Sequence, residues 1–319
     1  MQTGYSLLSE EIKKEILKVE ESVVGVNARI LLEIHTYEYV TRNGRPVSDP
    51  TSPLGYKLLS SNGSDGVIIA DDEKMLSGGG LIIDRGFQAE DYAILTSSHL
   101  VAPKDTTDIY YVDKDGVQTD VLFQRHIVKN VVLSVRGSGN WHVTAQLVAN
   151  DPIDDLAVIL AETKRRLGAE YPNRLAYDRK MSWGDWVFIF GYPREIKQMT
   201  GGWVSKSPYR GTFAVDAVVR FGFSGGPVFA ISKEQSQLVF VGVIKSVPSG
   251  KMDYIAPDVT LPVGYRLRRD DVDKLMVQRQ IVVSYGSAYC VSPKRIERFL
   301  KRTRMTLERL GIVLAPRYF

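Results

Sequence analysis

The sequence predicts an all-β protein with a helix near each end of the chain. Short apolar and β-branched runs recur along most of the 319 residues, and glycine and proline interrupt them at the intervals typical of sandwiches and barrels. Strands do not alternate with helices, which argues against a doubly wound sheet or a TIM barrel. A hydrophobic content of 44% and a charged content of 24% are ordinary for globular proteins and argue against a disordered, collagen-like or coiled-coil chain.

The N-terminal helix is expected over residues 8–23. Ser9 suits the N-cap, and the acidic pair Glu10 and Glu11 suits the first turn. Apolar residues then recur at helical spacing: Ile12, Ile16, Val19 and Val23. We interpret this segment as a packing helix; an oligomerisation or regulatory arm is the alternative.

The strands are expected where apolar runs are bounded by turn residues. These runs are 26–40, 79–85, 91–97, 108–112, 131–136, 143–149, 156–160, 186–190, 202–206, 212–216, 227–231, 238–245 and 281–291. Two stretches do not fit a compact β core, 41–77 and 248–280, and we expect them to be long loops with either a bland surface role or a regulatory one. The polar segment 161–177 is typical of a linker between two β halves.

The C-terminal helix has clear end signals. Ser292 suits the N-cap, Pro293 the first helical position and Gly311 the C-terminal end. One face is apolar and the other is basic, carrying Lys294, Arg295, Arg298, Lys301, Arg302 and Arg304. Residues 294–319 carry eight basic and two acidic residues, a charge of +6, whereas the net charge of the whole chain is only +4, so its basic balance comes from this tail. We interpret the basic face as solvated; binding of an acidic partner, a membrane surface or nucleic acid is the alternative.

The cysteine and histidine content limits the sites the chain can form. Cys290 is the single cysteine, so an intramolecular disulfide is excluded, and four dispersed histidines argue against a metal centre. We expect Cys290 to be a small buried residue in a strand and the protein to need no cofactor. No signal-peptide pattern and no run of 18 apolar residues is visible, so the sequence predicts a cytoplasmic protein without a membrane span.

The strongest chemical motif is Gly222-Phe223-Ser224-Gly225-Gly226-Pro227. Glycines on both sides of a serine allow tight turns, expose the hydroxyl and aim backbone N–H groups at a developing oxyanion. The same pattern occurs in the nucleophile elbow of α/β-hydrolases, where the histidine follows the serine. All four histidines precede the serine here, namely His35, His99, His126 and His142. The elbow is therefore excluded, and the order His, Asp, Ser remains.

The sequence favours one histidine and one acid as partners of this serine. His99 lies just beyond the strand-like apolar run that contains Ile94 and Leu95, and the end of a strand holds a general base rigidly. The other histidines lie inside a strand or among polar residues without that context. Asp155 directly precedes an apolar strand, where it can accept the imidazole N–H and fix the tautomer of the histidine. The neighbouring Asp154 fits the same argument, so it remains the alternative acid.

These segments resemble the trypsin-like serine protease superfamily and, within it, the HtrA/Deg branch. The matching motifs are Thr-Ser-Ser-His at 96–99, Asp-Leu-Ala-Val at 155–158 and Gly-Phe-Ser-Gly-Gly-Pro at 222–227, and the resemblance extends over roughly residues 24–310. It implies two antiparallel β-barrels with the active site between them, and a cofactor-free serine endopeptidase. His99 and Asp155 would come from the first barrel and Ser224 from the second, with the N–H groups of Gly222 and Ser224 binding the oxyanion.

The resemblance also implies a division of the chain. The parts are a helical arm (1–24), a first barrel with the 41–77 insertion (25–160), a linker (161–177), a second barrel with the 248–280 insertion (178–291) and a basic helix (292–319). Many HtrA-like proteases carry a PDZ domain after the protease, but only eight residues follow Gly311, so we expect none. Relatives of this branch often trimerise, which implies a homo-oligomer.

Phe223 and the expected substrate pocket depart from trypsin itself. Zymogen-type trypsins carry an aspartate at the position of Phe223, which cannot pair with an ammonium group, so we expect neighbouring loops or a regulatory partner to set the oxyanion loop. By alignment Val218 lies at the pocket base, and the walls are Val219, Lys245, Ser246 and Val247. Without a carboxylate at the base, cleavage is expected after small or medium aliphatic residues. A catalytically silent protease-fold scaffold that binds partners is the alternative.

Overall fold

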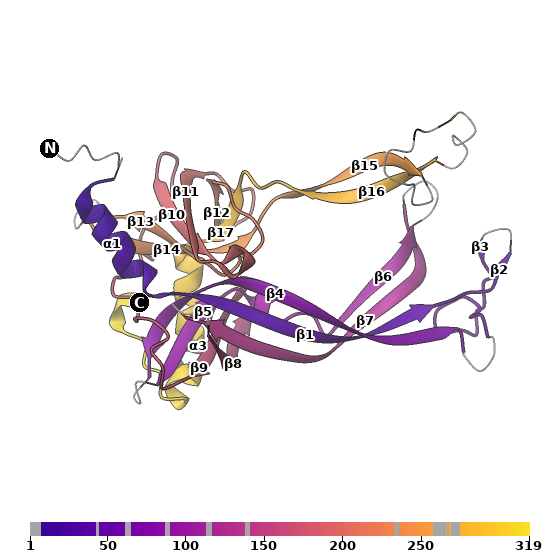
Figure 1. Ribbon diagram of the computed structural model, residues 1–319, viewed down its shortest axis with the longest axis horizontal. Coiled ribbons are helices and arrows are strands. Elements are labelled where there is room, and N and C mark those ends of the chain that lie inside the picture. Colours follow the sequence, from indigo (N-terminus) through magenta and orange to yellow (C-terminus); the bar gives the residue numbers. More distant parts are fainter. Residues whose placement is uncertain are drawn as a thin grey trace.

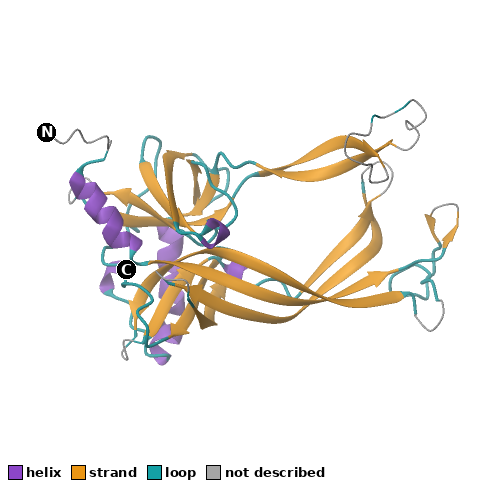
Figure 2. Ribbon diagram, viewed as in Figure 1, coloured by secondary structure: helices purple, strands orange, loops and turns teal. Residues whose placement is uncertain are grey.

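The computed structural model describes residues 8–42, 45–60, 65–86, 90–112, 117–137, 141–232, 236–257, 266, 268 and 275–319. Its strands form two barrels with a helix near each end of the chain (Figures 1 and 2), so the predicted fold class is confirmed. No helix in these ranges is long and apolar enough to cross a membrane.

The first barrel closes because its first strand pairs on both edges. The strand order is β1 (Val23–Tyr37), β4 (Val67–Arg85), β5 (Asp91–Thr96), β9 (Leu156–Glu162), β8 (His142–Asp151) and β7 (Gln118–Arg136), and β7 returns to β1. A further strand, β6 (Thr106–Val112), lies along the other edge of β7. Alternate residues of these strands fill the interior, among them Val26, Ile82 and Ile94, which are fully buried.

The second barrel is built in the same way from the C-terminal half. Its order is β10 (Trp186–Gly191), β11 (Gln198–Ser205), β12 (Thr212–Asp216), β17 (Ala288–Val291), β14 (Leu238–Ser246) and β13 (Pro227–Ile231). Cys290 lies in its core, as expected, and burial raises the pKa of its thiol well above the usual range. The thiol therefore stays protonated and acts as a small apolar side chain.

A third core joins the barrels to the helices. Helix α1 (Glu10–Glu20) buries Ile12 and Val19 there, and the Ser9 hydroxyl accepts the Ile12 N–H at 3.3 Å. Helix α3 (Pro293–Arg309) contributes its apolar face, which consists of Ile296, Phe299, Leu300 and Leu307. Ser292 occupies the N-cap of α3, but its side chain makes no capping hydrogen bond. Short helices complete the structure: α2 (Ser98–Val101), η1 (Pro193–Glu195) and η3 (Pro316–Tyr318).

Two arms extend from the barrels toward the same side of the molecule (Figure 1). The sheet arm consists of the outer parts of β1, β4 and β7 together with β6, and it ends near the two-residue strands β2 (Thr41–Arg42) and β3 (Arg45–Pro46). The hairpin arm consists of β15 (Ser249–Pro257) and β16 (Leu275–Val283). A satellite core stabilises the end of the sheet arm, where Tyr39 donates to the Leu122 carbonyl at 2.7 Å and burial raises the pKa of Tyr39 to about 12.

The arms differ from the loops that the sequence predicts at 41–77 and 248–280. Residues 67–77, 249–257 and 275–280 are strand; parts of both stretches, 43–44, 61–64, 258–265, 267 and 269–274, lie outside the described residues. A strand exposed on both faces carries no hydrophobic alternation, so the polar run Asp71-Asp72-Glu73 looked like a loop although it pairs with β1 throughout. The predicted strand 281–291 is also interrupted, because a turn separates β16 from β17.

Candidate active site

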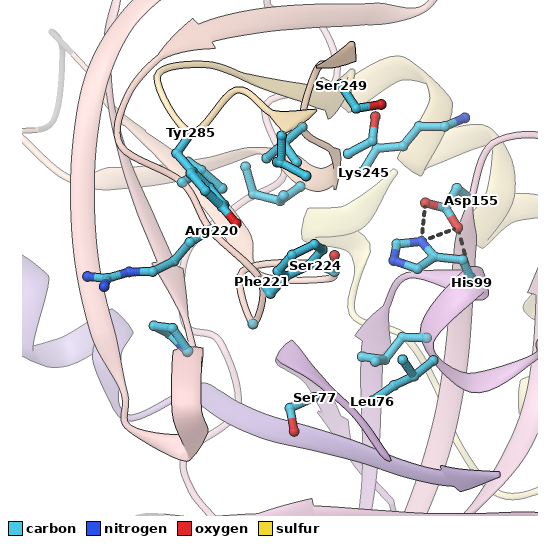
Figure 3. Close-up of a pocket in the computed structure, with 18 of the residues that line it drawn as sticks. Leu76, Ser77, His99, Asp155, Arg220, Phe221, Ser224, Lys245, Ser249 and Tyr285 are labelled. Carbon is cyan, nitrogen blue, oxygen red and sulfur yellow. Dashed lines mark hydrogen bonds and ion pairs between the residues drawn. The ribbon is translucent and has the colours of Figure 1, made fainter. Parts of the chain in front are cut away.

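A cleft of about 1290 Å³ contains every predicted site residue (Figure 3). The predicted residues that line it are His99, Asp155, Val218, Val219, Gly222, Ser224, Lys245, Ser246 and Val247. The bases of both arms also line it, through Met75, Leu76 and Ser77 of β4 and through Ser249 and Val283 of the hairpin arm. The other histidines lie in strands away from this lining, His35 in β1, His126 in β7 and His142 at the start of β8.

Asp155 holds the ring and the backbone of His99. The His99 Nδ1 atom lies 2.8 Å from Asp155 Oδ2 and 3.0 Å from Oδ1, and the His99 backbone N–H donates to Oδ1 at 2.9 Å. The carboxylate is only 8% exposed, whereas the imidazole is 48% exposed. These contacts favour the tautomer protonated at Nδ1, and in Figure 3 the other ring nitrogen is turned toward Ser224. Asp154, the alternative acid, points elsewhere.

The aspartate loop, residues 151–155, is held by the C-terminal helix. Asp151 and Asp154 are both buried and form ion pairs with Arg302 and Arg295 of α3, respectively. Asp151 Oδ1 also accepts the N–H groups of residues 153 and 154, at 2.9 and 3.1 Å. Asp155 itself has a left-handed backbone, with φ of 59°, a conformation that a non-glycine residue adopts only when its surroundings impose it.

These ion pairs change the interpretation of the basic helix face. Arg295 and Arg302 are bound to the aspartate loop rather than solvated, whereas Lys294 and Arg298 are exposed. Sequence reasoning missed this role, because the partners lie 141 and 151 residues apart. The nearest signal in the sequence is the closely spaced acids at 151, 154 and 155, which need cations if they are buried together.

The nucleophile loop, residues 222–227, is held by backbone contacts. The Gly222 carbonyl accepts the Tyr192 N–H at 2.7 Å, and the Ser224 carbonyl accepts the Gly79 N–H at 2.8 Å. Gly222 has a φ of 101°, and a Cβ added at Gly226 would lie 1.9 Å from the Phe190 carbonyl oxygen. The glycines of the motif are therefore required by close approach and by a positive φ.

Two backbone donors of this loop are free. The N–H groups of Phe223, Gly225 and Gly226 all bond to carbonyls of the chain, but those of Gly222 and Ser224 have no acceptor among the described residues. Ser224 Oγ likewise has no hydrogen-bond partner there, and a serine–histidine bond often tightens only when substrate binds. The arrangement leaves two donors beside the hydroxyl that can bind an anionic oxygen.

Phe223 anchors the nucleophile loop in the second barrel. Its ring is buried in the barrel core, and a Cβ added at Gly191 would lie 2.5 Å from its Cδ1 atom. The aromatic ring thus fills the space that the missing side chain at residue 191 leaves. The buried ring of Phe223 therefore gives the nucleophile loop an apolar anchor in the barrel core.

The rim of the cleft beside Ser224 is apolar and aromatic. Val218 is exposed in the cleft, and Val219, next to it, is fully buried in the barrel core. Phe221 and Tyr285 form an edge-on pair with ring centroids 6.3 Å apart, which sequence reasoning did not single out. Lys245 donates to the Ile153 carbonyl at 3.0 Å, so its ammonium group is turned toward the aspartate loop.

Comparison with known proteins gives consistent matches. Residues 78–239, about half of the chain, match the family described as "Trypsin-like peptidase domain". A protein of Bartonella henselae named "Probable periplasmic serine endoprotease DegP-like" is 27% identical over 194 residues, which are 58% of this chain and 37% of that protein. A protein of the same name from Rhizobium meliloti is 30% identical over 178 residues, 52% of this chain and 32% of that protein. The chain thus spans about a third of the length of these relatives.

Two solved structures of the HtrA-type protease AlgW with a decapeptide are also similar. Their TM-scores are 0.49 and 0.48 and their sequence identities 17% and 15%; they cover 96% and 94% of this chain, and each match covers 68% of the solved chain.

The names of the relatives correct one expectation. They are called periplasmic, so the cytoplasmic location predicted from the sequence is wrong. The prediction relied on the lack of a visible signal-peptide pattern and on the single cysteine. The cysteine count does not decide the compartment, because a cysteine-poor chain is also compatible with an oxidising one.

Proposed function

This chain belongs to the trypsin-like peptidase family, and we propose on that premise that it is a serine endopeptidase acting through His99, Asp155 and Ser224. The observation that carries the proposal is the pair of hydrogen bonds that ties His99 to a buried Asp155, in the cleft that also holds Ser224. The names of the relatives support the same activity, and they support a periplasmic location.

Each group has a defined role in the proposed reaction. Asp155 keeps the Nδ1 proton on His99, so Nε2 takes the Ser224 proton as Oγ attacks the peptide carbonyl. The free N–H groups of Gly222 and Ser224 stabilise the negative oxygen of the tetrahedral intermediate. His99 then protonates the leaving amine, and an acyl-enzyme remains for water to hydrolyse.

We propose cleavage after small or medium aliphatic residues. Within the described part of the chain, the only carboxylate that lines the cleft is that of Asp155, which is bound to His99. Three cationic side chains also line it, those of Arg194, Arg220 and Lys245. A lysine or arginine side chain of the substrate would meet like charges there, whereas an aliphatic one would contact Val218 and its neighbours.

A fluorophosphonate probe tests the proposed function directly. The wild-type protein should be labelled covalently, and Ser224→Ala should not be. Ser77→Ala is the matched control, because Ser77 lines the same cleft outside the triad and its loss should leave labelling intact. A folded wild-type protein that neither labels nor cleaves Val- or Ala-ended peptides would support the silent scaffold instead.

A further inference from the structure

Strand β4 has two halves with different surroundings. It pairs with β1 on one edge along Val67–Leu81, and its inner part, Leu81–Arg85, pairs with β5 on the other edge. Its outer half, Val67–Ser77, pairs only with β1, and no other described strand lies along its second edge. We call this second edge the open edge of β4.

The open edge lacks several of the features that usually protect a strand edge. Residues 68–75 are all exposed, and the large apolar ones, Ile68, Ile69 and Met75, are about half exposed or more. The segment contains no proline, its register with β1 has no bulge, and Lys74 is its only lysine. Such an edge presents unpaired backbone groups and is ready to accept another extended chain.

The open edge begins at the nucleophile. Met75, Leu76 and Ser77 line the cleft, and two residues further the Gly79 N–H donates to the Ser224 carbonyl. With a rise of about 3.3 Å per residue, the edge continues for about 33 Å from the cleft to Val67. A chain lying in the cleft can therefore run onto this edge without a turn.

The charge on the open edge indicates what kind of chain fits. Asp71 and Asp72 are exposed and have no ion-pair partner among the described residues, whereas Glu73 is paired with Arg29 at 2.8 Å. Neighbouring residues of a strand face opposite sides of the sheet, so one carboxylate is available on each face. Lysine or arginine side chains of an added strand would be complementary on either face.

We propose that the open edge of β4 binds one flank of the substrate as an added β-strand and favours a basic flank. This inference rests on the proposed function and deepens it by naming the substrate class, an extended or unfolded polypeptide with a basic segment beside the cleaved bond. Main-chain pairing supplies affinity that does not depend on sequence, and the two carboxylates supply the charge preference.

Quenched fluorescent peptides can test the proposal with the full chain. The probes are a short peptide with a Val-Ala core and the same peptide extended at either end by eight residues of alternating Thr-Lys, Thr-Glu or Pro-Lys. The Thr-Lys extension at one end should raise kcat/KM about tenfold, mainly through KM. Thr-Glu should not, and Pro-Lys should not either, since it keeps the charge but lacks alternate N–H groups.

Charge reversal on the edge provides the second readout. The double variant Asp71→Lys/Asp72→Lys should prefer the Thr-Glu extension and cleave the unextended peptide at the wild-type rate. Asp105→Lys is the control, because this exposed residue precedes β6 at the opposite edge of the sheet arm and should leave the preference unchanged.

Several outcomes would overturn the proposal. They are no gain from extension at either end, an equal gain with Pro-Lys, or a gain that survives the charge reversal. A change in sedimentation of the double variant without any extension effect would instead assign the edge to a second copy of the chain. Cleavage of the unextended peptide, lost in Ser224→Ala, checks the proposed function separately from this inference.

Discussion

The aspartate loop and the nucleophile loop reach the same cleft by different physical means. The aspartate loop is held by side-chain charges, since its buried acids pair with Arg295 and Arg302 of a distant helix. The nucleophile loop is held by backbone hydrogen bonds and by glycines that let it lie against β10 and β4. The aspartate loop should therefore lose its conformation when an arginine partner is removed. The nucleophile loop should lose its conformation when a side-chain atom is added to one of its glycines.

Adding one carbon to the nucleophile loop should have the largest effect. In Gly226→Ala the new Cβ would lie 1.9 Å from a β10 carbonyl oxygen, so the loop or the strand must move. We expect fluorophosphonate labelling to disappear and the melting temperature to fall. Gly250→Ala is the control, since nothing lies within 4 Å of its new Cβ. Normal labelling by Gly226→Ala would show that the backbone contact does not hold the loop.

Removing the apolar anchor of the nucleophile loop, the Phe223 ring, should have the second-largest effect. Phe223→Ala empties a fully buried site in the second barrel and should cost about 3–5 kcal/mol of unfolding free energy. Labelling should fall with it, because the Gly222 and Ser224 donors flank this residue. Phe223→Leu should retain most of the stability and most of the labelling, as measured by denaturant unfolding and by the fluorophosphonate assay. Labelling that stays at the wild-type rate in a folded Phe223→Ala would exclude the anchoring role.

The aspartate loop can be weakened through a charge instead. Arg295→Gln leaves the Asp154 carboxylate buried without its partner, which should cost about 3 kcal/mol and lower kcat about tenfold with KM unchanged. Adding Asp154→Asn in the same chain should restore kcat, because the unpaired charge is then gone. Arg298→Gln on the exposed face of α3 is the matched control. Equal losses in kcat and 1/KM, or no rescue by Asp154→Asn, would contradict the positioning role.

Arg302→Gln should have the smallest effect. More than half of the Arg302 side chain is exposed, so solvent screens its pair with Asp151 and the loss should be about 1 kcal/mol or less. The loss should shrink further at high salt, unlike that of the nucleophile-loop variants. Thermal unfolding at low and high ionic strength measures this difference, and a salt-independent loss would show that packing of the arginine matters more than its charge.

The sequence by itself determined the fold class and the order of the chemically active residues. Strands that are buried on one face show an alternating apolar pattern, and glycines around a serine are a local motif. Both features can therefore be recognised from the sequence alone. The position of all four histidines before Ser224 removed one hydrolase class by order alone. The choice between Asp154 and Asp155 stayed open at that stage, because adjacent acids differ only in where their side chains point.

Only the tertiary structure decided what surrounds those residues. It directs Asp155 to His99 and Asp154 to Arg295, a partner 141 residues away that no local pattern indicates. The fold also pairs the polar stretch after residue 66 with β1 and makes it a strand with an open edge. A strand that is solvated on both faces has no hydrophobic periodicity from which it could be predicted. The local periodicity of apolar residues indicates which side chains are buried. Long-range ion pairs and exposed strands depend instead on which segments the fold brings together.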